Sequence, residues 1–90
     1  MLERDIEAYL RDRVKAIGGV AYKFVSPTNR GVSDRVVVLP SGVVWFVELK
    51  TLKGRLTPLQ VQFADKMKSL GQRYALLRSK EEVNEWLESL

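Results

Sequence analysis

The sequence predicts an α/β domain in which helices pack on a mixed β-sheet. Apolar residues recur at spacings of three and four in three segments, which is typical of amphipathic helices. Between these segments lie short runs rich in Val, Phe and Trp, which favour strands. The resulting order is helix, three strands, helix, strand, helix. It combines an antiparallel hairpin with a strand that returns after a helix, and therefore indicates a mixed sheet.

A first helix is expected over residues 2–17, where the residues at helical spacing are Leu2, Ile6, Leu10, Val14 and Ile17. The Gly18-Gly19 pair stops this helix. The first strand is expected over residues 20–25, because VAYKFV is rich in β-branched and aromatic side chains. The next six residues, SPTNRG at 26–31, have the composition of a loop.

A hairpin is expected from the strands 34–39 and 43–50, which are joined by Pro40-Ser41-Gly42. Three residues that end in glycine are a preferred hairpin connection, with the glycine in the left-handed conformation. The two strands should then pair antiparallel, with Leu39 opposite Val43. Because both strands are almost continuously apolar, burial on both faces is expected.

The second helix should span residues 58–70, after a basic loop at 51–57. Thr57 is a good N-cap, Pro58 fits the first helical position, and Gln60 completes a capping box. Gly71 ends this helix. The chain then continues with a strand at 72–77 and a last helix, and the capping residues and apolar side expected for that helix are Ser79, Glu82, Val83, Trp86, Leu87 and Leu90.

Composition excludes several classes of function. The 90 residues are 46% hydrophobic and 29% charged, which suits one small domain with a buried core. The absence of Cys and His excludes disulfides, zinc–thiolate sites and histidine-based catalysis. No apolar run approaches the roughly 20 residues that span a bilayer. The N-terminus, charged from Glu3 onward, is unlike a signal peptide, so a cytoplasmic location is expected. A net charge of +4 mildly favours a polyanionic partner.

The acidic residues of the hairpin carry the strongest chemical signal. Symmetric pairing about Pro40-Ser41-Gly42 places Asp34 opposite Glu48, and opposed like charges destabilise a sheet. A bound cation is the natural counter-charge, and hard oxygen ligands suit Mg²⁺ or Mn²⁺. Lys50 lies on the same face as Glu48, two residues later, and the backbone carbonyl of Leu49 could add a ligand. A shift of one residue in register would separate the two carboxylates.

The alternative is structural: Asp34 caps a turn, while Glu48 and Lys50 form a solvent-facing pair on an edge strand. That interpretation is the usual one for an isolated Glu-x-Lys in a strand. The aspartate at matching depth, the glycine-containing loop before it and the basic loop after Lys50 favour the metal site here.

The segments GVSD at 31–34 and VELK at 47–50 resemble the PD-(D/E)xK nuclease signature. The flanks are similar to the VRR-NUC branch of that superfamily, the virus-type replication–repair nucleases. The further matching features are the Glu3, Ile6, Glu7 and Leu10 pattern, the Gly-Gly turn, KFVSP at 23–27, FVELK at 46–50 and LTPLQ at 56–60. The resemblance covers residues 3–77. Ser33 departs from it, since the family has proline before the aspartate, and this change affects the geometry of the loop.

This resemblance implies an αβββαβ core with a C-terminal helix and one VRR-NUC-like domain over residues 1–90. It implies a metal-dependent deoxyribonuclease that uses Mg²⁺ or Mn²⁺. Minimal stand-alone members are phage-encoded or bacterial homodimers that act on branched DNA such as Holliday junctions. A phage-encoded member would act in the cytoplasm of its bacterial host. By the same likeness, Asp34 and Glu48 are metal ligands, Lys50 is the catalytic lysine, and Gln60 is the family's glutamine.

The family also uses a glutamate from the first helix, for which Glu3 and Glu7 are both candidates. On a helical wheel Glu3 falls inside the apolar arc and Glu7 at its margin, so Glu3 is favoured and Glu7 stays open. Structural roles are the alternatives, because Glu3 also suits a helix start and Glu7 can pair with Arg11. Gln60 suits a capping role as well as a catalytic one.

Basic residues near the proposed centre are candidates for gripping DNA phosphates: Lys53, Arg55, Arg30, Lys23 and Arg35. Two other functions compete with the nuclease. One is a non-catalytic DNA-binding module on the same fold, which would need the basic loops but gains nothing from clustered carboxylates. The other is a small interaction subunit whose charge is only solubilising. Divalent-ion binding separates them, since only the nuclease predicts it.

Overall fold

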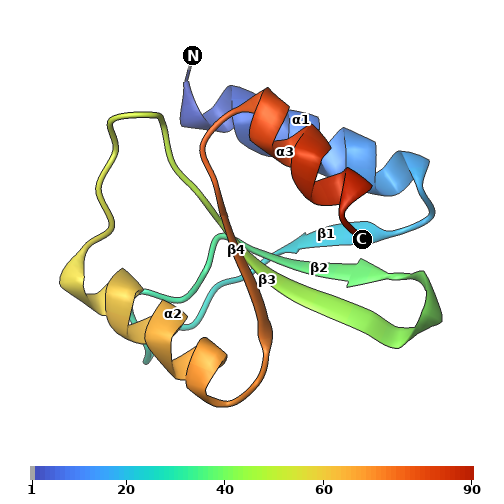
Figure 1. Ribbon diagram of the computed structural model, residues 1–90. Helices are drawn as coiled ribbons and strands as arrows, with labels where there is room; N and C mark the ends of the chain where they lie inside the picture. The colour runs from blue at the N-terminus through green and yellow to red at the C-terminus, as the bar shows by residue number, and fades with distance from the viewer. Residues whose placement is uncertain (1) are drawn as a thin grey trace.

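The structure, a computed structural model, describes residues 2–90 and confirms the predicted fold class (Figure 1). The order of the elements is the expected one, and their bounds differ from expectation by one or two residues. The helices and strands are α1 (Glu3–Ala16), β1 (Val20–Lys23), β2 (Arg35–Leu39), β3 (Val43–Leu49), α2 (Pro58–Ser69), β4 (Arg73–Leu77) and α3 (Lys80–Glu88). No helix within residues 2–90 is long and apolar enough to cross a lipid bilayer.

The four strands form one mixed sheet in the order β1-β2-β3-β4. The pairs β1–β2 and β2–β3 are antiparallel, and β3–β4 is parallel. The helices α1 and α3 cover one face, while α2 lies against one end of the other face (Figure 1). This arrangement brings the start of α1 and the start of α2 toward the same end of β3, where the functional residues gather.

The β2–β3 turn sets the register of the hairpin. Leu39 pairs with Val43, as expected, and Gly42 has the left-handed conformation with φ 75°. The turn is assigned as a short 3₁₀ segment over Pro40–Gly42, but Ser41 within it is also left-handed, with φ 68°, and departs from helical geometry. The confirmed register fixes which side chains share a face along both strands.

The core lies between the sheet and the pair α1 and α3. Its buried apolar residues are Ile6, Leu10, Val14, Ala21, Val37, Leu39, Val47, Leu49, Leu77, Val83 and Trp86. The rings of Trp45 and Trp86 pack edge to face at 5.6 Å. Leu2 and Ile17, expected in the apolar stripe, are instead about half exposed, because both lie just outside the ends of α1.

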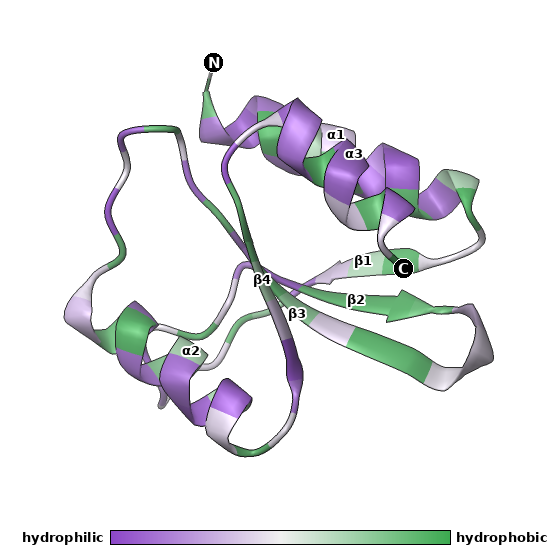
Figure 2. Cartoon of the chain, in the orientation of Figure 1, coloured by the Kyte–Doolittle hydropathy of each residue, from purple (hydrophilic) through white to green (hydrophobic). Residues whose placement is uncertain are grey.

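The opposite face is covered over part of its area, so the expectation that the hairpin is buried on both faces is wrong for its outer half. Under α2 the rings of Phe24, Phe46, Phe63 and Tyr74 pack at 5.8 to 6.4 Å. Beyond α2, toward the β2–β3 turn, four uncharged side chains are exposed: Val20, Tyr22, Val38 and Val44. The helix α2 lies against one end of this face and leaves them uncovered (Figure 1). The strand β2 and the outer part of β3 are hydrophobic in sequence (Figure 2).

Candidate active site

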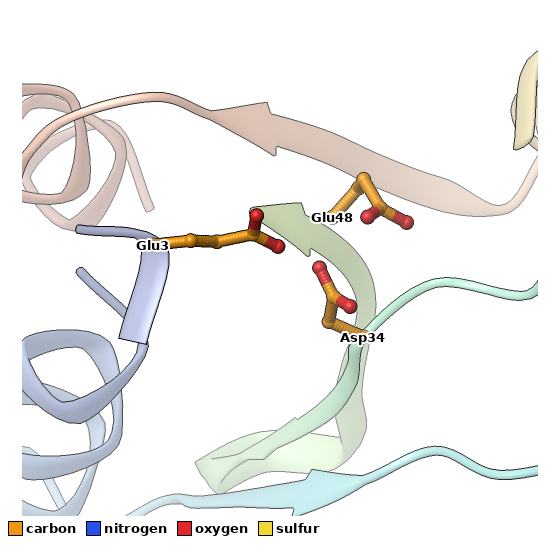
Figure 3. Close-up of side chains that lie close together, drawn as sticks. All are labelled: Glu3, Asp34 and Glu48. Carbon is orange, nitrogen blue, oxygen red and sulfur yellow. The ribbon is translucent and has the colours of Figure 1, made fainter. Parts of the chain in front are cut away.

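Three carboxylates from separate parts of the chain meet at one point (Figure 3). Glu3 comes from the first turn of α1, Asp34 immediately precedes β2, and Glu48 lies on β3. Each offers an oxygen atom, and these atoms all lie within 4.8 Å of one another. A single cation could therefore contact all three carboxylates, which we call the acidic cluster.

The hairpin positions two members of the cluster. Arg35 pairs with Val47, so Asp34 lies opposite Glu48 one step beyond the paired residues, in the register expected from the sequence. The carboxylate of Asp34 accepts a hydrogen bond from the Leu49 amide at 2.8 Å. Its backbone carbonyl accepts another from the Phe24 amide at 3.0 Å. Asp34 is thus held from both neighbouring strands.

The electrostatics of the cluster favour a bound cation. Glu48 is 1% exposed, and burial raises its pKa, with a hydrogen bond to Asp34 and the charge of Asp34 adding to the rise. Burial and the charge of Asp34 also raise the pKa of Glu3. The nearby ammonium of Lys50 lowers the pKa of both glutamates but does not cancel these effects. Clustered hard oxygen donors that lack sufficient positive charge fit Mg²⁺ or Mn²⁺.

Gln60 forms the expected cap and also contacts a member of the acidic cluster. The side-chain Oε1 of Gln60 accepts a hydrogen bond from the backbone amide of Thr57 at 2.9 Å, and the backbone amide of Gln60 donates to Thr57 Oγ1 at 3.2 Å. These bonds form the expected capping box. The Nε2 group of Gln60 lies 3.5 Å from Glu48 Oε2 and donates to it. One side chain therefore caps α2 and also contacts the acidic cluster.

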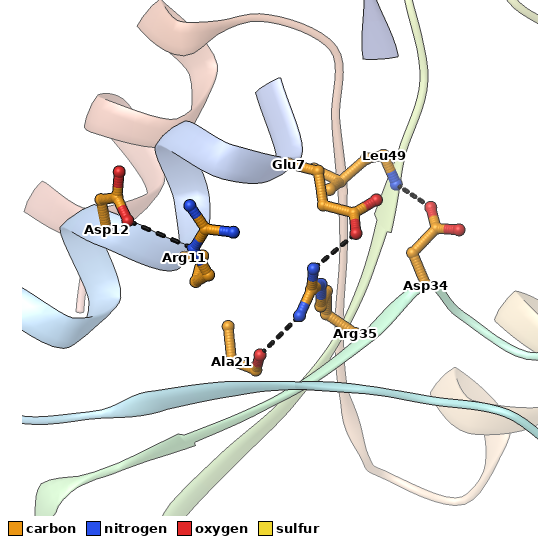
Figure 4. A network of polar contacts seen from close by, with 7 residues as sticks. All are labelled: Glu7, Arg11, Asp12, Ala21, Asp34, Arg35 and Leu49. Carbon is orange, nitrogen blue, oxygen red and sulfur yellow. Dashed lines mark hydrogen bonds and ion pairs between the residues drawn. The ribbon is translucent and has the colours of Figure 1, made fainter. Parts of the chain in front are cut away.

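Glu7, the other candidate from the first helix, pairs with Arg35 and is not part of the acidic cluster (Figure 4). Arg35 also donates from Nη1 to the Ala21 carbonyl at 2.8 Å. Its side chain is only 11% exposed, so Arg35, a candidate for phosphate contact by sequence, instead holds α1 to the sheet. The structural alternative, a pair between Glu7 and Arg11, does not form, because Arg11 pairs with Asp12 at 3.2 Å. The structure brings Glu3, not Glu7, to Asp34 and Glu48.

The other basic candidates are exposed: Lys23, Arg30, Lys53 and Arg55. Lys53 and Arg55 belong to the loop that follows Lys50. Arg78, which sequence reasoning missed, holds this loop. Its Nη1 donates to the carbonyls of Thr51 at 2.8 Å and Gly54 at 2.6 Å. Nothing in the sequence pattern marks Arg78, because its partners are backbone atoms 24 and 27 residues away.

Tyr74 and Ser33 are two further residues near the cluster whose environment the sequence did not reveal. The Tyr74 hydroxyl is buried and has no hydrogen-bond partner within residues 2–90. Burial, followed by the charges of Glu48 and Asp34, raises its pKa to about 12. Ser33, where the family has proline, is 1% exposed, and its hydroxyl donates to the Arg35 carbonyl at 3.3 Å. This bond ties the segment before Asp34 to the start of β2.

Comparison with known proteins agrees with the fold. No family model matches the chain. A protein named "Putative nuclease p44", from Acyrthosiphon pisum secondary endosymbiont phage 1, is 44% identical over 79 residues, which are 88% of this chain and 85% of that protein. A solved structure named "VRR_NUC domain" matches with a TM-score of 0.91 at 29% identity, covering 96% of this chain and 94% of that one.

A second solved structure, named "VRR_NUC domain protein", matches with a TM-score of 0.76. It covers 98% of this chain and 86% of that one at 10% identity, a level that shows a shared fold alone. The phage relative and the first structure go further, since each combines near-complete coverage with substantial identity. The chain belongs to the VRR-NUC family of PD-(D/E)xK nucleases.

Proposed function

We propose that this nuclease is a metal-dependent DNA endonuclease whose centre contains Glu3, Asp34 and Glu48. The observation that carries the proposal is the acidic cluster, whose three carboxylates offer oxygens within 4.8 Å of one another. A module that merely binds DNA gains nothing from carboxylates, because they repel phosphates. The clustering of three carboxylates is explained if together they hold a divalent cation.

Each residue of the site has a proposed role. Oxygens of Asp34, Glu48 and Glu3 would hold Mg²⁺ or Mn²⁺, with the Leu49 carbonyl as a further ligand. Such a cation supplies Lewis acidity toward phosphate oxygens and lowers the pKa of water. Lys50 would hold the attacking water or stabilise negative charge that grows on the phosphate. Gln60 would orient Glu48 through its Nε2 group.

Exposed cations would bind the DNA backbone on either side of this centre. The proposed contacts are Lys53, Arg55, Arg30 and Lys23, which are all exposed. Contacts to phosphate position a duplex but carry no sequence information. A domain of this size is therefore more suited to reading the shape of DNA than its sequence.

We also propose that the enzyme is a homodimer that joins two copies through the outer half of the sheet. Val20, Val38 and Val44 are paired neighbours on three adjacent strands, and Tyr22 lies beside them. They are 38% to 58% exposed and carry no charge. A second copy of the same strip can cover it without burying an ion, and a twofold interface is self-complementary. DNA, a polyanion, has no reason to select it.

A twofold dimer would carry two acidic clusters, which suits paired cuts across a branched substrate. The proposed substrate is therefore branched DNA such as a Holliday junction, encountered in the cytoplasm of a bacterial host. Symmetric incision of the two opposed strands is the outcome that this arrangement predicts.

Cleavage of labelled DNA tests the function. Purified protein is incubated with a four-way junction, a duplex and a single strand, each with Mg²⁺, Mn²⁺ or EDTA. Lys50→Ala and Asp34→Asn should lower cleavage by a factor of about 10³ or more. Calorimetry should show that Asp34→Asn also abolishes binding of the cation. Asp65→Asn is the matched control, because Asp65 is an exposed acid on α2 outside the cluster and its loss should change neither result.

The outcomes separate the proposals. Tight DNA binding with no cleavage under any metal would identify a binding module instead. Cleavage of all three substrates would retain the nuclease and reject selectivity for junctions. Sedimentation tests the dimer: Val38→Lys should convert it to a monomer, whereas a monomeric wild-type protein at micromolar concentration would reject it.

A further inference from the structure

A groove lies between the segment 26–32 and α2, and the roles proposed above leave it unassigned apart from Arg30. We call it the α2 groove; its volume is about 380 Å³. Phe24, Val32 and Phe63 line it and are half-buried, whereas Arg30, Gln62 and Lys66 line it and are exposed. The groove therefore offers aromatic and aliphatic contacts in its depth, with two cations and an amide at the surface.

The α2 groove is joined to the acidic cluster by the backbone. Phe24, which lines the groove, donates its amide hydrogen to the carbonyl of Asp34. Leu59, which also lines it, directly precedes Gln60, whose side chain contacts Glu48. The groove and the acidic cluster are therefore built on adjoining residues of the same segments, although the groove's lining includes no member of the cluster.

The lining suits a single nucleotide. A nucleobase is flat and largely apolar on its faces, whereas its phosphates are anionic, and this groove presents both kinds of partner. Arg30 and Lys66 would contact phosphates, and Gln62 could exchange hydrogen bonds with a base edge. A base must leave the duplex stack to enter such a groove, and this costs least for a base that is unpaired or mismatched.

We propose that the α2 groove holds one unpaired nucleotide of the DNA, beside the phosphodiester that is cleaved. The proposal deepens the proposed nuclease function and rests on it for the position of the cut. It also defines the substrate class: DNA in which at least one nucleotide next to the scissile bond can leave the base stack.

Binding of modified junctions tests this occupant without requiring cleavage. In the presence of Mg²⁺, the Lys50→Ala protein is titrated into a series of four-way junctions. Each junction carries one abasic residue, and its position shifts by one nucleotide across the branch point from one junction to the next. Fluorescence anisotropy gives the dissociation constant of each. We expect one position at which loss of the base weakens binding about tenfold, and little change elsewhere. A flat profile would overturn the proposal.

A variant that fills the groove tests the site itself. Gln62→Trp, in the same protein, should weaken binding of the intact junction and remove the dependence on abasic position. Val61→Trp is the matched control, since Val61 is an exposed neighbour on α2 that does not line the groove. Val61→Trp should keep the positional effect. Circular dichroism checks that both variants are folded, and Lys66→Gln, a milder change, should weaken binding of every junction alike.

Two results distinguish the proposals from each other. A positional effect that survives Gln62→Trp would place the unpaired nucleotide elsewhere and overturn the assignment of the groove. Absence of cleavage by wild-type protein would reject the nuclease function, whereas the abasic profile would still decide whether the groove holds a base.

Discussion

The ion pair between Arg35 and Glu7 ties α1 to the sheet directly beside the acidic cluster (Figure 4). Arg35 follows Asp34 in the chain and also donates to the Ala21 carbonyl on β1. Glu7 lies one helical turn after Glu3, which is a member of the cluster. The pair therefore fixes the place of the helix whose first turn must bring Glu3 to the other two carboxylates.

Glu7→Gln should weaken Mg²⁺ or Mn²⁺ binding about tenfold and lower the free energy of unfolding by about 2–4 kcal/mol. The loss of stability follows because Arg35 would keep its charge in a largely buried position without an anionic partner. Calorimetry measures the affinity for the cation, and urea unfolding in EDTA measures the free energy of unfolding. Asp12→Asn removes an exposed ion pair on the same helix and should cost at most about 0.5 kcal/mol. Equal costs for the two variants would contradict this view.

A double-variant cycle separates positioning from general destabilisation. In a Glu3→Gln background, Glu7→Gln should cause little further loss of metal affinity, because the carboxylate that it positions is already absent. If instead the two losses of affinity add fully, the Arg35–Glu7 pair does not act through Glu3.

The stability of the metal-free protein should fall as pH rises. The pKa values of Glu48 and Glu3 are raised in the folded state, chiefly by burial, so above pH 4.5 the native state binds more protons than the unfolded state. Their stabilising contribution is complete below the unfolded pKa and is lost as pH rises through the raised values. Thermal unfolding in EDTA from pH 5 to 9 measures the decline. Glu48→Gln should flatten it and raise the melting temperature at pH 8; an unchanged slope would contradict the assignment.

The position of Asp34 opposite Glu48 was predictable because a short turn fixes the register of a hairpin. Local rules were sufficient there, as they were for the capping box of Thr57 and Gln60. The helical wheel favoured Glu3 over Glu7 but could not decide between them, since both lie near the apolar arc. Their separation depends on Arg35, whose contact with α1 is a property of the packed structure.

The other differences between the sequence-based expectations and the structure also come from tertiary contacts that the sequence pattern does not reveal. Arg35 was a candidate for contacting DNA, but its guanidinium is largely buried against the Ala21 carbonyl and Glu7. Arg78 bonds to carbonyls in a distant loop, a contact that leaves no spacing signal in the sequence. The exposure of Val38 and Val44 reflects the limited reach of α2, which an apolar strand pattern cannot reveal.

Arg78→Lys should raise the KM for DNA about tenfold while leaving metal affinity unchanged. The variant keeps the positive charge but loses the guanidinium group whose Nη1 donates to the carbonyls of both Thr51 and Gly54, so the loop that carries Lys53 and Arg55 would be less ordered. Steady-state cleavage separates KM from kcat, and calorimetry measures the metal. Arg73→Lys, at an exposed position of β4, is the control. A fall confined to kcat, or a loss of metal binding, would show that Arg78 acts on the centre itself.

Gly31 holds the segment 26–32 tightly against the start of α2, so Gly31→Ala should be among the costly substitutions in the chain. Its φ is +80°, and an added Cβ would come within 2.4 Å of the Leu59 carbonyl carbon and 2.8 Å of the Gln60 amide nitrogen.

Gly71 is the matched control, because its φ is +73° but an added Cβ would meet no atom within 4 Å. Gly71→Ala should therefore cost about 1 kcal/mol from backbone conformation alone. Urea unfolding should give a loss of about 3 kcal/mol or more for Gly31→Ala, with reduced cleavage because Gln60 is displaced. Equal losses for the two variants would mean that the close approach at Leu59 contributes nothing.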